Sequence, residues 1–192
     1  MFLIGPRGAG KTSAGRLAAG MLDLPFVDTD AGIEERTGQT VTELFTREGE
    51  ACFRVLEREL LLELLAGHEP VLRAPLRTPG RLRRSARGAS IVATGGGCIL
   101  APDVRAALSR RAGVVWLFAP LPVLQLRIQG SGRPSLTGAD PVDELALLVR
   151  EREPLYRESC HGGVQLDTGE LSPAQVATFI ARRYHALVEG GA

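Results

Sequence analysis

The chain has 192 residues, of which 23% are charged, and its formal net charge at pH 7 is +1. This length suits one domain with a substantial core, and the balanced charge gives no general reason to expect a nucleic-acid partner. Three scattered cysteines without CxxC spacing exclude a zinc site of that type and indicate reduced thiols in a cytoplasmic protein. No apolar run reaches the roughly 18 residues that a membrane helix needs.

A phosphate-binding loop is the clearest local motif. Residues 5–12 read GPRGAGKT, which fits the pattern G-x-x-x-x-G-K-[ST] between a short apolar run and a helical pattern. Glycines let the backbone N–H groups converge on phosphate oxygens, and the following helix adds its dipole. The motif predicts that Lys11, the only lysine, reaches the β- and γ-phosphates, and that Thr12 places a hydroxyl on Mg²⁺. The alternative is a glycine-rich turn without a ligand.

Two carboxylates follow the next apolar segment. A helix is predicted over 12–22, and the sequence PFVDTD at 25–30 then predicts a short buried strand. Strand alternation would point Asp28 and Asp30 to one side, with one supporting Mg²⁺ through water and the other meeting an acceptor hydroxyl. The alternative is that Asp30 caps a helix over 31–36.

The next segments predict two helices. Thr40 and Glu43 have the spacing of a capping box that opens a short helix, and residues 50–65 form an amphipathic helix. Spacing alone makes Arg54, on the second helix, an ordinary solvated arginine.

An arginine-rich segment precedes the next strand. Residues 67–90 contain several Pro, Gly and Arg, which is typical of a solvated loop, although a surface for a polyanion stays open. Residues 90–94 predict a strand that runs into three glycines at 95–97. Because glycine weakens regular elements, we assign these glycines no packing purpose and expect their backbone to touch a ligand; a simple tight turn is the alternative.

The remaining pattern alternates helices and strands. Arg133 lies in a glycine-flanked segment that suits a closing lid or, equally, an exposed loop. Helices are expected at 102–110, 121–128, 140–152 and 172–188, and strands at 113–118 and 164–167. With strands near Phe2, Phe26 and Ile91, the order predicts an α/β fold in which a five-stranded parallel sheet has helices on both faces.

The ordered motifs resemble the shikimate kinase family of small P-loop kinases. The resemblance runs from Phe2 to about Ile180 and rests on these segments in order: GPRGAGKT at 5–12, VDTD at 27–30, ERTG at 35–38, FR at 53–54, TGGG at 94–97, GRP at 132–134, and Arg152 before PLY at 154–156. It implies a nucleoside monophosphate kinase-like fold with a mobile lid. It also implies transfer of the γ-phosphoryl of MgATP to the 3-hydroxyl of shikimate in aromatic amino-acid biosynthesis.

The resemblance also implies roles for individual residues. Shikimate would be held by Asp30, Arg54, Gly96 and Arg152, in a pocket shaped by Phe45, Phe53 and Glu57. Lys11, Asp30 and Arg133 would be catalytic, and Mg²⁺ would be held by Thr12 and, through water, by Asp28. The nucleotide would contact Gly8, Ala9, Gly10, Lys11, Thr12, Ser13, Arg127, Arg133 and Pro173.

The expected organisation is one kinase domain over 1–192. Within it we expect an acceptor-binding segment at about 30–60, an arginine-rich insertion at about 70–89 and a lid at about 129–138. The insertion departs from the family, and of two possible registers for the central strand we favour 91–94. The expected protein is a cytoplasmic monomer with ATP and shikimate as partners. A same-fold kinase for another small hydroxylated acid and a non-catalytic nucleotide-dependent binding module remain alternatives.

Overall fold

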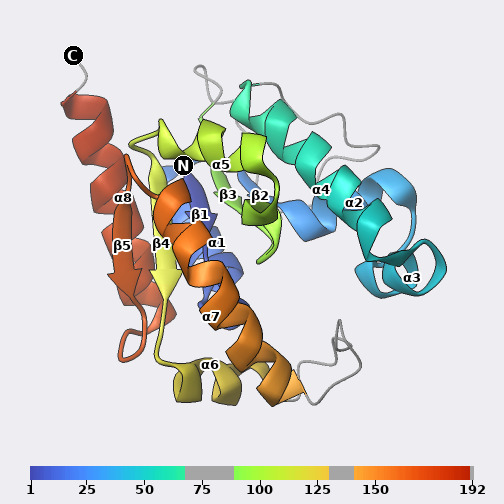
Figure 1. Ribbon diagram of the computed structural model, residues 1–192. Helices are drawn as coiled ribbons and strands as arrows, with labels where there is room; N and C mark the ends of the chain where they lie inside the picture. The colour runs from blue at the N-terminus through green and yellow to red at the C-terminus, as the bar shows by residue number, and fades with distance from the viewer. Residues whose placement is uncertain (68–88, 130–140, 191–192) are drawn as a thin grey trace.

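The computed structural model describes residues 1–67, 89–129 and 141–190 (Figure 1). Except for residues 89 and 129 at their ends, the predicted insertion and the predicted lid with Arg133 lie outside these ranges. Within the described ranges, no helix is both long enough and apolar enough to cross a membrane.

Five strands form one parallel sheet in the order β2-β3-β1-β4-β5. They are β1 (Phe2–Ile4), β2 (Phe26–Asp28), β3 (Ile91–Ala93), β4 (Val114–Phe118) and β5 (Val164–Asp167). Phe2 stands opposite Val92 on one side and Val114 on the other. The predicted register of the central strand is therefore confirmed, since β3 begins at Ile91 and runs directly toward the three glycines.

Helices cover both faces of the sheet. They are α1 (Lys11–Leu22), α2 (Thr29–Thr37), α3 (Val41–Arg47), α4 (Gly49–Leu65), α5 (Pro102–Ser109), α6 (Leu121–Ile128), α7 (Pro141–Ser159) and α8 (Pro173–Glu189), with a 3₁₀ turn, η1, at Cys98–Leu100. In Figure 1, α5 and α7 cross one face of the sheet while α1 lies on the other, with α2 and α3 beyond the β2 edge. The predicted α/β architecture is confirmed.

Alternating side chains of the strands feed two separate cores. Phe2 and Ile4 of β1 pack in the core beneath α4, α5 and α7, whereas Leu3 between them packs in the core beneath α1 and α8. Both sets are buried because successive strand residues point to opposite faces and helices cover both. This explains why the central strands read as continuous apolar runs.

Asp28, not Asp30, caps the helix that follows β2. The strand ends at Asp28, whose carboxylate accepts hydrogen bonds from the backbone N–H groups of Asp30 (3.1 Å) and Ala31 (3.5 Å). The expected strand through Asp30 and the alternative cap at Asp30 are therefore both wrong. A short acidic side chain in extended backbone can satisfy two N–H groups of the first turn, so the helix begins two residues earlier than expected.

Helix α7 continues past Pro154, beyond the predicted end at Arg152. Proline lacks an N–H and crowds the preceding turn, which costs about 3 kcal/mol in a helix interior. The continuation buries Tyr156, which is 2% exposed, and Ser159, which donates a hydrogen bond to the carbonyl of Leu155 at 2.8 Å. Burial and hydrogen bonding in the last turns thus offset a local penalty that the sequence pattern reads as a stop.

Two glycines of α1 provide a test of how closely the helix approaches the sheet. A Cβ at Gly15 would stand 2.8 Å from Leu3 Cδ1 and 2.9 Å from Phe26 Cε2, whereas one at Gly20 would meet no atom of the described residues within 4 Å. We expect Gly15→Ala to lower the free energy of unfolding by about 1–3 kcal/mol through overpacking. Gly20→Ala should raise it by about 0.5–1 kcal/mol, because alanine favours the helix. Urea unfolding of both variants checks this. If both substitutions changed the free energy of unfolding in the same direction, the close approach at Gly15 would be contradicted.

Candidate functional site

The loop after β1 has the backbone form of a phosphate cradle. Gly8 and Gly10 have positive φ values of 85° and 89°, and Gly10 precedes the first residue of α1. No side chain in the described part of the structure caps the N-terminus of α1, and the first-turn N–H groups of a helix have no acceptor within the helix. Converging N–H groups at a helix N-terminus form an anion site, which agrees with the predicted role of residues 8–13.

Lys11 lies across its own loop. Its Nζ donates hydrogen bonds to the carbonyls of Gly5 and Pro6, each at 2.8 Å. The ammonium group is therefore held over the concave side of the loop. This places a positive charge at the loop that the motif assigns to phosphate binding.

Thr12 and Asp28 meet beside the loop. The Thr12 hydroxyl donates to Asp28 Oδ2 at 2.8 Å, although the two residues are separated by 16 positions and lie on α1 and at the end of β2. A hydroxyl and a carboxylate are the hard oxygen ligands that Mg²⁺ accepts directly or through water. The donor chemistry at this place therefore fits the predicted cation.

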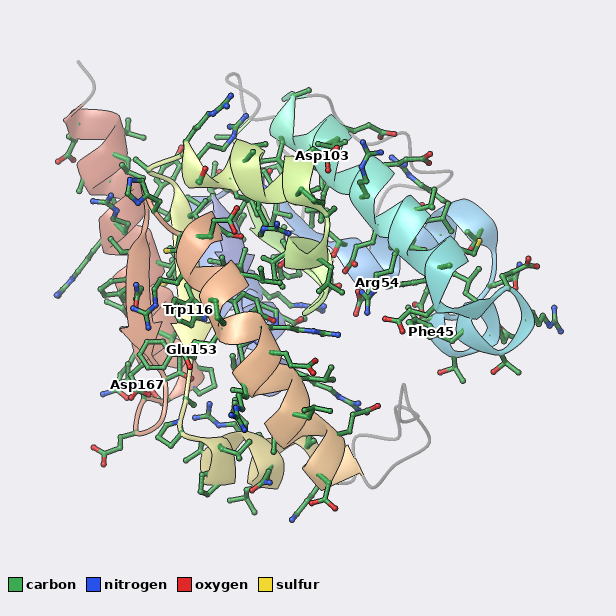
Figure 2. The ribbon with its side chains drawn as sticks, viewed as in Figure 1. Phe45, Arg54, Asp103, Trp116, Glu153 and Asp167 are labelled. Atoms are coloured by element: carbon green, nitrogen blue, oxygen red, sulfur yellow. The ribbon has the colours of Figure 1, made fainter. Side chains whose placement is uncertain are left out.

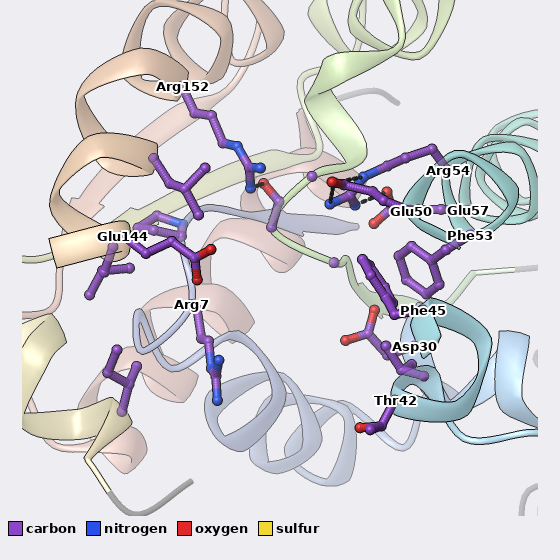
Figure 3. A pocket seen from close by; sticks show the side chains of 18 of the residues that line it. Arg7, Asp30, Thr42, Phe45, Glu50, Phe53, Arg54, Glu57, Glu144 and Arg152 are labelled. Carbon is purple, nitrogen blue, oxygen red and sulfur yellow. Dashed lines mark hydrogen bonds and ion pairs between the residues drawn. The ribbon is translucent and has the colours of Figure 1, made fainter. Parts of the chain in front are cut away.

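A cavity of about 610 Å³ adjoins the phosphate loop (Figure 3). Its walls come from the phosphate loop, α2, α3, α4, the three-glycine loop and α7. The described residues that line it include Arg7, Asp30, Phe45, Phe53, Arg54, Glu57, Gly96 and Arg152. The structure thus brings together all four residues predicted to hold the acceptor, and the three that were predicted to shape the pocket.

Arg54 is held by two carboxylates of its own helix. Its Nη1 donates to Glu57 Oε2 at 2.7 Å, and its Nη2 and Nε donate to Glu50 Oε1 at 2.7 and 3.0 Å. The guanidinium also lies over the ring of Phe53, 5.3 Å from the centroid. These contacts fix the guanidinium at the cavity wall, where it can present N–H groups to an anion.

Gly95 and Gly97 do have a packing role, which corrects the sequence prediction at these two positions. A Cβ at Gly95 would stand 2.1 Å from Glu57 Oε1, and a Cβ at Gly97 would stand 2.0 Å from Arg54 Nη1. Any other residue would displace one member of this ion pair. Glycine is required at 95 and 97 because two charged side chains of α4 press against the loop.

Helix α7 holds the middle of that loop. The Tyr156 hydroxyl donates to the Gly96 carbonyl at 2.6 Å, and Arg152 Nη1 donates to the same oxygen at 3.3 Å. Tyr156 had no predicted role. Its position four residues after Arg152, on the same face of a helix, is the signal that could have identified it.

Burial alters the proton affinity of three groups around the loop. Burial raises the pKa of Glu57, the charge of Asp30 adds to this rise, and Arg54 opposes it. Burial and nearby Glu57 raise the pKa of the Cys98 thiol to about 12, and burial also raises the pKa of Tyr156. Cys98 and Tyr156 therefore stay protonated near neutral pH.

Arg127 connects the phosphate loop to the loop after β5. Its Nη2 donates to the Thr168 carbonyl at 2.6 Å, and its Nη1 donates to Thr168 Oγ1 at 3.0 Å and to the Gly8 carbonyl at 3.4 Å. Pro173 begins α8 a few residues later. Figure 2 shows Asp167, at the end of β5, on the opposite side of the molecule from Arg54. The phosphate loop thus lies between the loop after β5 on one side and the cavity lined by Arg54 on the other.

Three comparisons bear on the family of this chain. The family model for shikimate kinase matches residues 7–74 and 82–185, so the break in the match falls inside the predicted insertion. A shikimate kinase of Halorhodospira halophila is 37% identical over 191 residues, covering 99% of this chain and 93% of the relative. A shikimate kinase of Paracidovorax citrulli is 38% identical over 177 residues, covering 92% of this chain and 87% of the relative.

A solved structure agrees with the sequence matches. The shikimate kinase of Acinetobacter baumannii in complex with shikimate aligns with a TM-score of 0.75 and 31% identity, covering 99% of this chain and 92% of that chain. With a matching family model, relatives above 30% identity over nearly the whole length and the same fold, the chain belongs to the shikimate kinase family, which consists of ATP-dependent small-molecule kinases.

Proposed function

We propose that this protein transfers the γ-phosphoryl group of ATP to the 3-hydroxyl of shikimate, giving shikimate 3-phosphate and ADP for aromatic amino-acid biosynthesis. The observation that carries the proposal is the placement of Asp30, Arg54 and Arg152 around one cavity beside the phosphate loop. Shikimate bears one carboxylate and three hydroxyls. Two arginines suit the carboxylate, and an aspartate suits the hydroxyls.

The proposed chemistry divides between the two sides of the site. Lys11 and the N–H groups of residues 8–13 bind the phosphates and offset charge that develops during transfer. Asp30 orients the acceptor hydroxyl and accepts its proton. Mg²⁺ held by Thr12 and, through water, by Asp28 would neutralise charge on the β- and γ-phosphates. Arg133 is proposed as the lid arginine that reaches the phosphates, although it lies outside the described residues.

The remaining proposals concern the adenine side of the nucleotide site, the oligomeric state and the cellular location. Arg127 and Pro173 are proposed to lie on the adenine side, which is supported by the contact of Arg127 with both the phosphate loop and the loop after β5. We further propose that the enzyme works as a monomer in the cytoplasm.

The first test is release of ADP from MgATP by the purified protein with shikimate, with gluconate, with adenosine and without an acceptor. We expect shikimate-dependent release together with a product of the mass of shikimate 3-phosphate. Release with gluconate alone would keep the reaction class and overturn the acceptor. Release with none of the three would contradict the proposed activity.

A matched pair of arginines on α4 tests the acceptor side. Arg54 lines the cavity, whereas Arg58, one turn later, pairs with Asp103 and has a side chain 47% exposed. Arg54→Ala should raise the KM for shikimate by at least about 30-fold, because a buried charge-assisted contact is lost, and should change the KM for ATP little.

Arg58→Ala is the control, and it should leave both KM values nearly unchanged because an exposed ion pair contributes little. Steady-state kinetics with circular dichroism of each variant gives the comparison. Equal effects of the two substitutions would show that Arg54 does not contact the acceptor.

Asp28→Asn tests the proposed cation site without removing the helix cap. An asparagine oxygen can still accept the N–H groups of Asp30 and Ala31, so the fold should be retained. The Mg²⁺ concentration for half-maximal activity should rise by about 3-fold or more, because one negative charge near the cation is lost. Asp23→Asn, at the far end of α1, is the control. An unchanged Mg²⁺ requirement in Asp28→Asn would refute this assignment.

A further inference from the structure

Among the described residues, Glu57 finds a hydrogen-bond partner for one of its two carboxylate oxygens. The side chain is 2% exposed, and Oε2 accepts the hydrogen bond from Arg54. The other oxygen, Oε1, is buried and has no hydrogen-bond partner among the described residues. A buried carboxylate oxygen without a donor is costly, and a proton on that oxygen is one way to remove the cost.

A second carboxylate lies beside this oxygen. The position that a Cβ would take at Gly95 is 2.1 Å from Glu57 Oε1 and 2.9 Å from Asp30 Oδ1, so the two oxygens are at most about 5 Å apart. Figure 3 shows both side chains at the same end of the cavity. Two carboxylates this close, one of them fully buried, favour a state in which one carries a proton.

The surrounding charges leave Glu57 as the group that can change its charge. Arg54 opposes protonation of Glu57, but Glu50 already balances the charge of Arg54 from the same helix. Arg152 on α7 also favours the ionised form of Glu57. Cys98 and Tyr156 face Glu57 as well, and both remain neutral near pH 7 because burial raises their pKa values.

An anionic acceptor would shift this balance. The described residues lining the cavity include five acidic side chains (Asp30, Glu34, Glu50, Glu57 and Glu144) and three arginines (Arg7, Arg54 and Arg152). An acceptor carboxylate on Arg54 adds a negative charge near Glu57 and competes for the guanidinium that opposes its protonation. Filling the cavity also removes water, which further disfavours a charged carboxylate.

We infer that Glu57 takes up one proton from solvent when the carboxylate-bearing acceptor binds, so that acceptor binding is coupled to protonation. The proton on Oε1 would give this oxygen a hydrogen bond to donate toward Asp30, while Oε2 keeps its contact with Arg54. The inference rests on the proposed function for its acceptor, and it makes Glu57 a positioning residue that sets the pH dependence of binding.

The sign of the effect follows from linkage. A complex that holds more protons than the free protein and free acceptor loses affinity as pH rises. Above about pH 5 the acceptor carboxylate is itself ionised, so a decline in affinity through neutrality reports on the protein.

Titration calorimetry of shikimate binding without nucleotide tests the inference. At pH 7 the binding enthalpy is measured in phosphate and in Tris, whose ionisation enthalpies differ, and the difference gives the number of protons taken up. We expect uptake of about half a proton or more in the unmodified protein, with affinity falling as pH rises. The Glu57→Gln variant, in which the amide mimics the protonated acid, should bind with little uptake and little dependence on pH.

Glu34→Gln is the matched control, because it also removes one acidic charge from the cavity lining, and its side-chain oxygen can still accept the hydrogen bond from the Val41 backbone N–H. It should retain the proton uptake. Binding of shikimate by the unmodified protein without proton uptake would overturn the inference and leave the proposed function intact, as would uptake that persists in Glu57→Gln. Absence of shikimate binding would instead overturn the proposed acceptor, and the inference with it.

Discussion

The ion pair between Arg54 and Glu57 is the contact around which the acceptor side is built. It lies directly on the three-glycine loop, where a Cβ at Gly95 or Gly97 would clash with one of its members. The loop is held from the other side by Tyr156 of α7, which donates to the Gly96 carbonyl. Helix α4, the loop after β3 and helix α7 are therefore fixed relative to one another, and the cavity lies between them.

Burying such a pair has a physical cost. Removing two charges from water costs several kcal/mol for each ion, and the attraction between them offsets this only when further hydrogen bonds are made. Here Glu50 supplies them to Arg54, whereas Glu57 keeps one oxygen without a partner among the described residues. Apolar packing avoids this cost, so a buried ion pair is a weak source of stability, and the charged arrangement is consistent with the proposed binding of an anionic acceptor.

Much of the fold could be predicted because its signals are local. The apolar runs, the capping box at Thr40 and Glu43 and the phosphate loop each depend on residues close in the chain, and the structure contains all of them. The predictions that were wrong concern competition between local and distant contacts. Pro154 predicts the end of a helix because the cost of proline arises from contacts with the preceding turn. In the structure, burial of Tyr156 against the sheet outweighs that cost, and the helix continues. Gly95 and Gly97 read as having no packing purpose because nothing nearby in the chain shows that α4 presses on them.

By itself, the sequence determined the order of strands and helices, the phosphate loop and the residue types available for chemistry, since hydrophobic periodicity and turn formation act over a few residues. The strand pattern had already singled out Asp30, and resemblance to a family then pointed to Arg54 and Arg152. Only the tertiary structure decided which of these charges meet. Thr12 reaches Asp28 because β1 and β2 end at the same edge of a parallel sheet, and Glu57 reaches Gly95 because α4 packs across that edge. Such contacts depend on distances in space between segments far apart in the chain, and no pattern within either segment contains them.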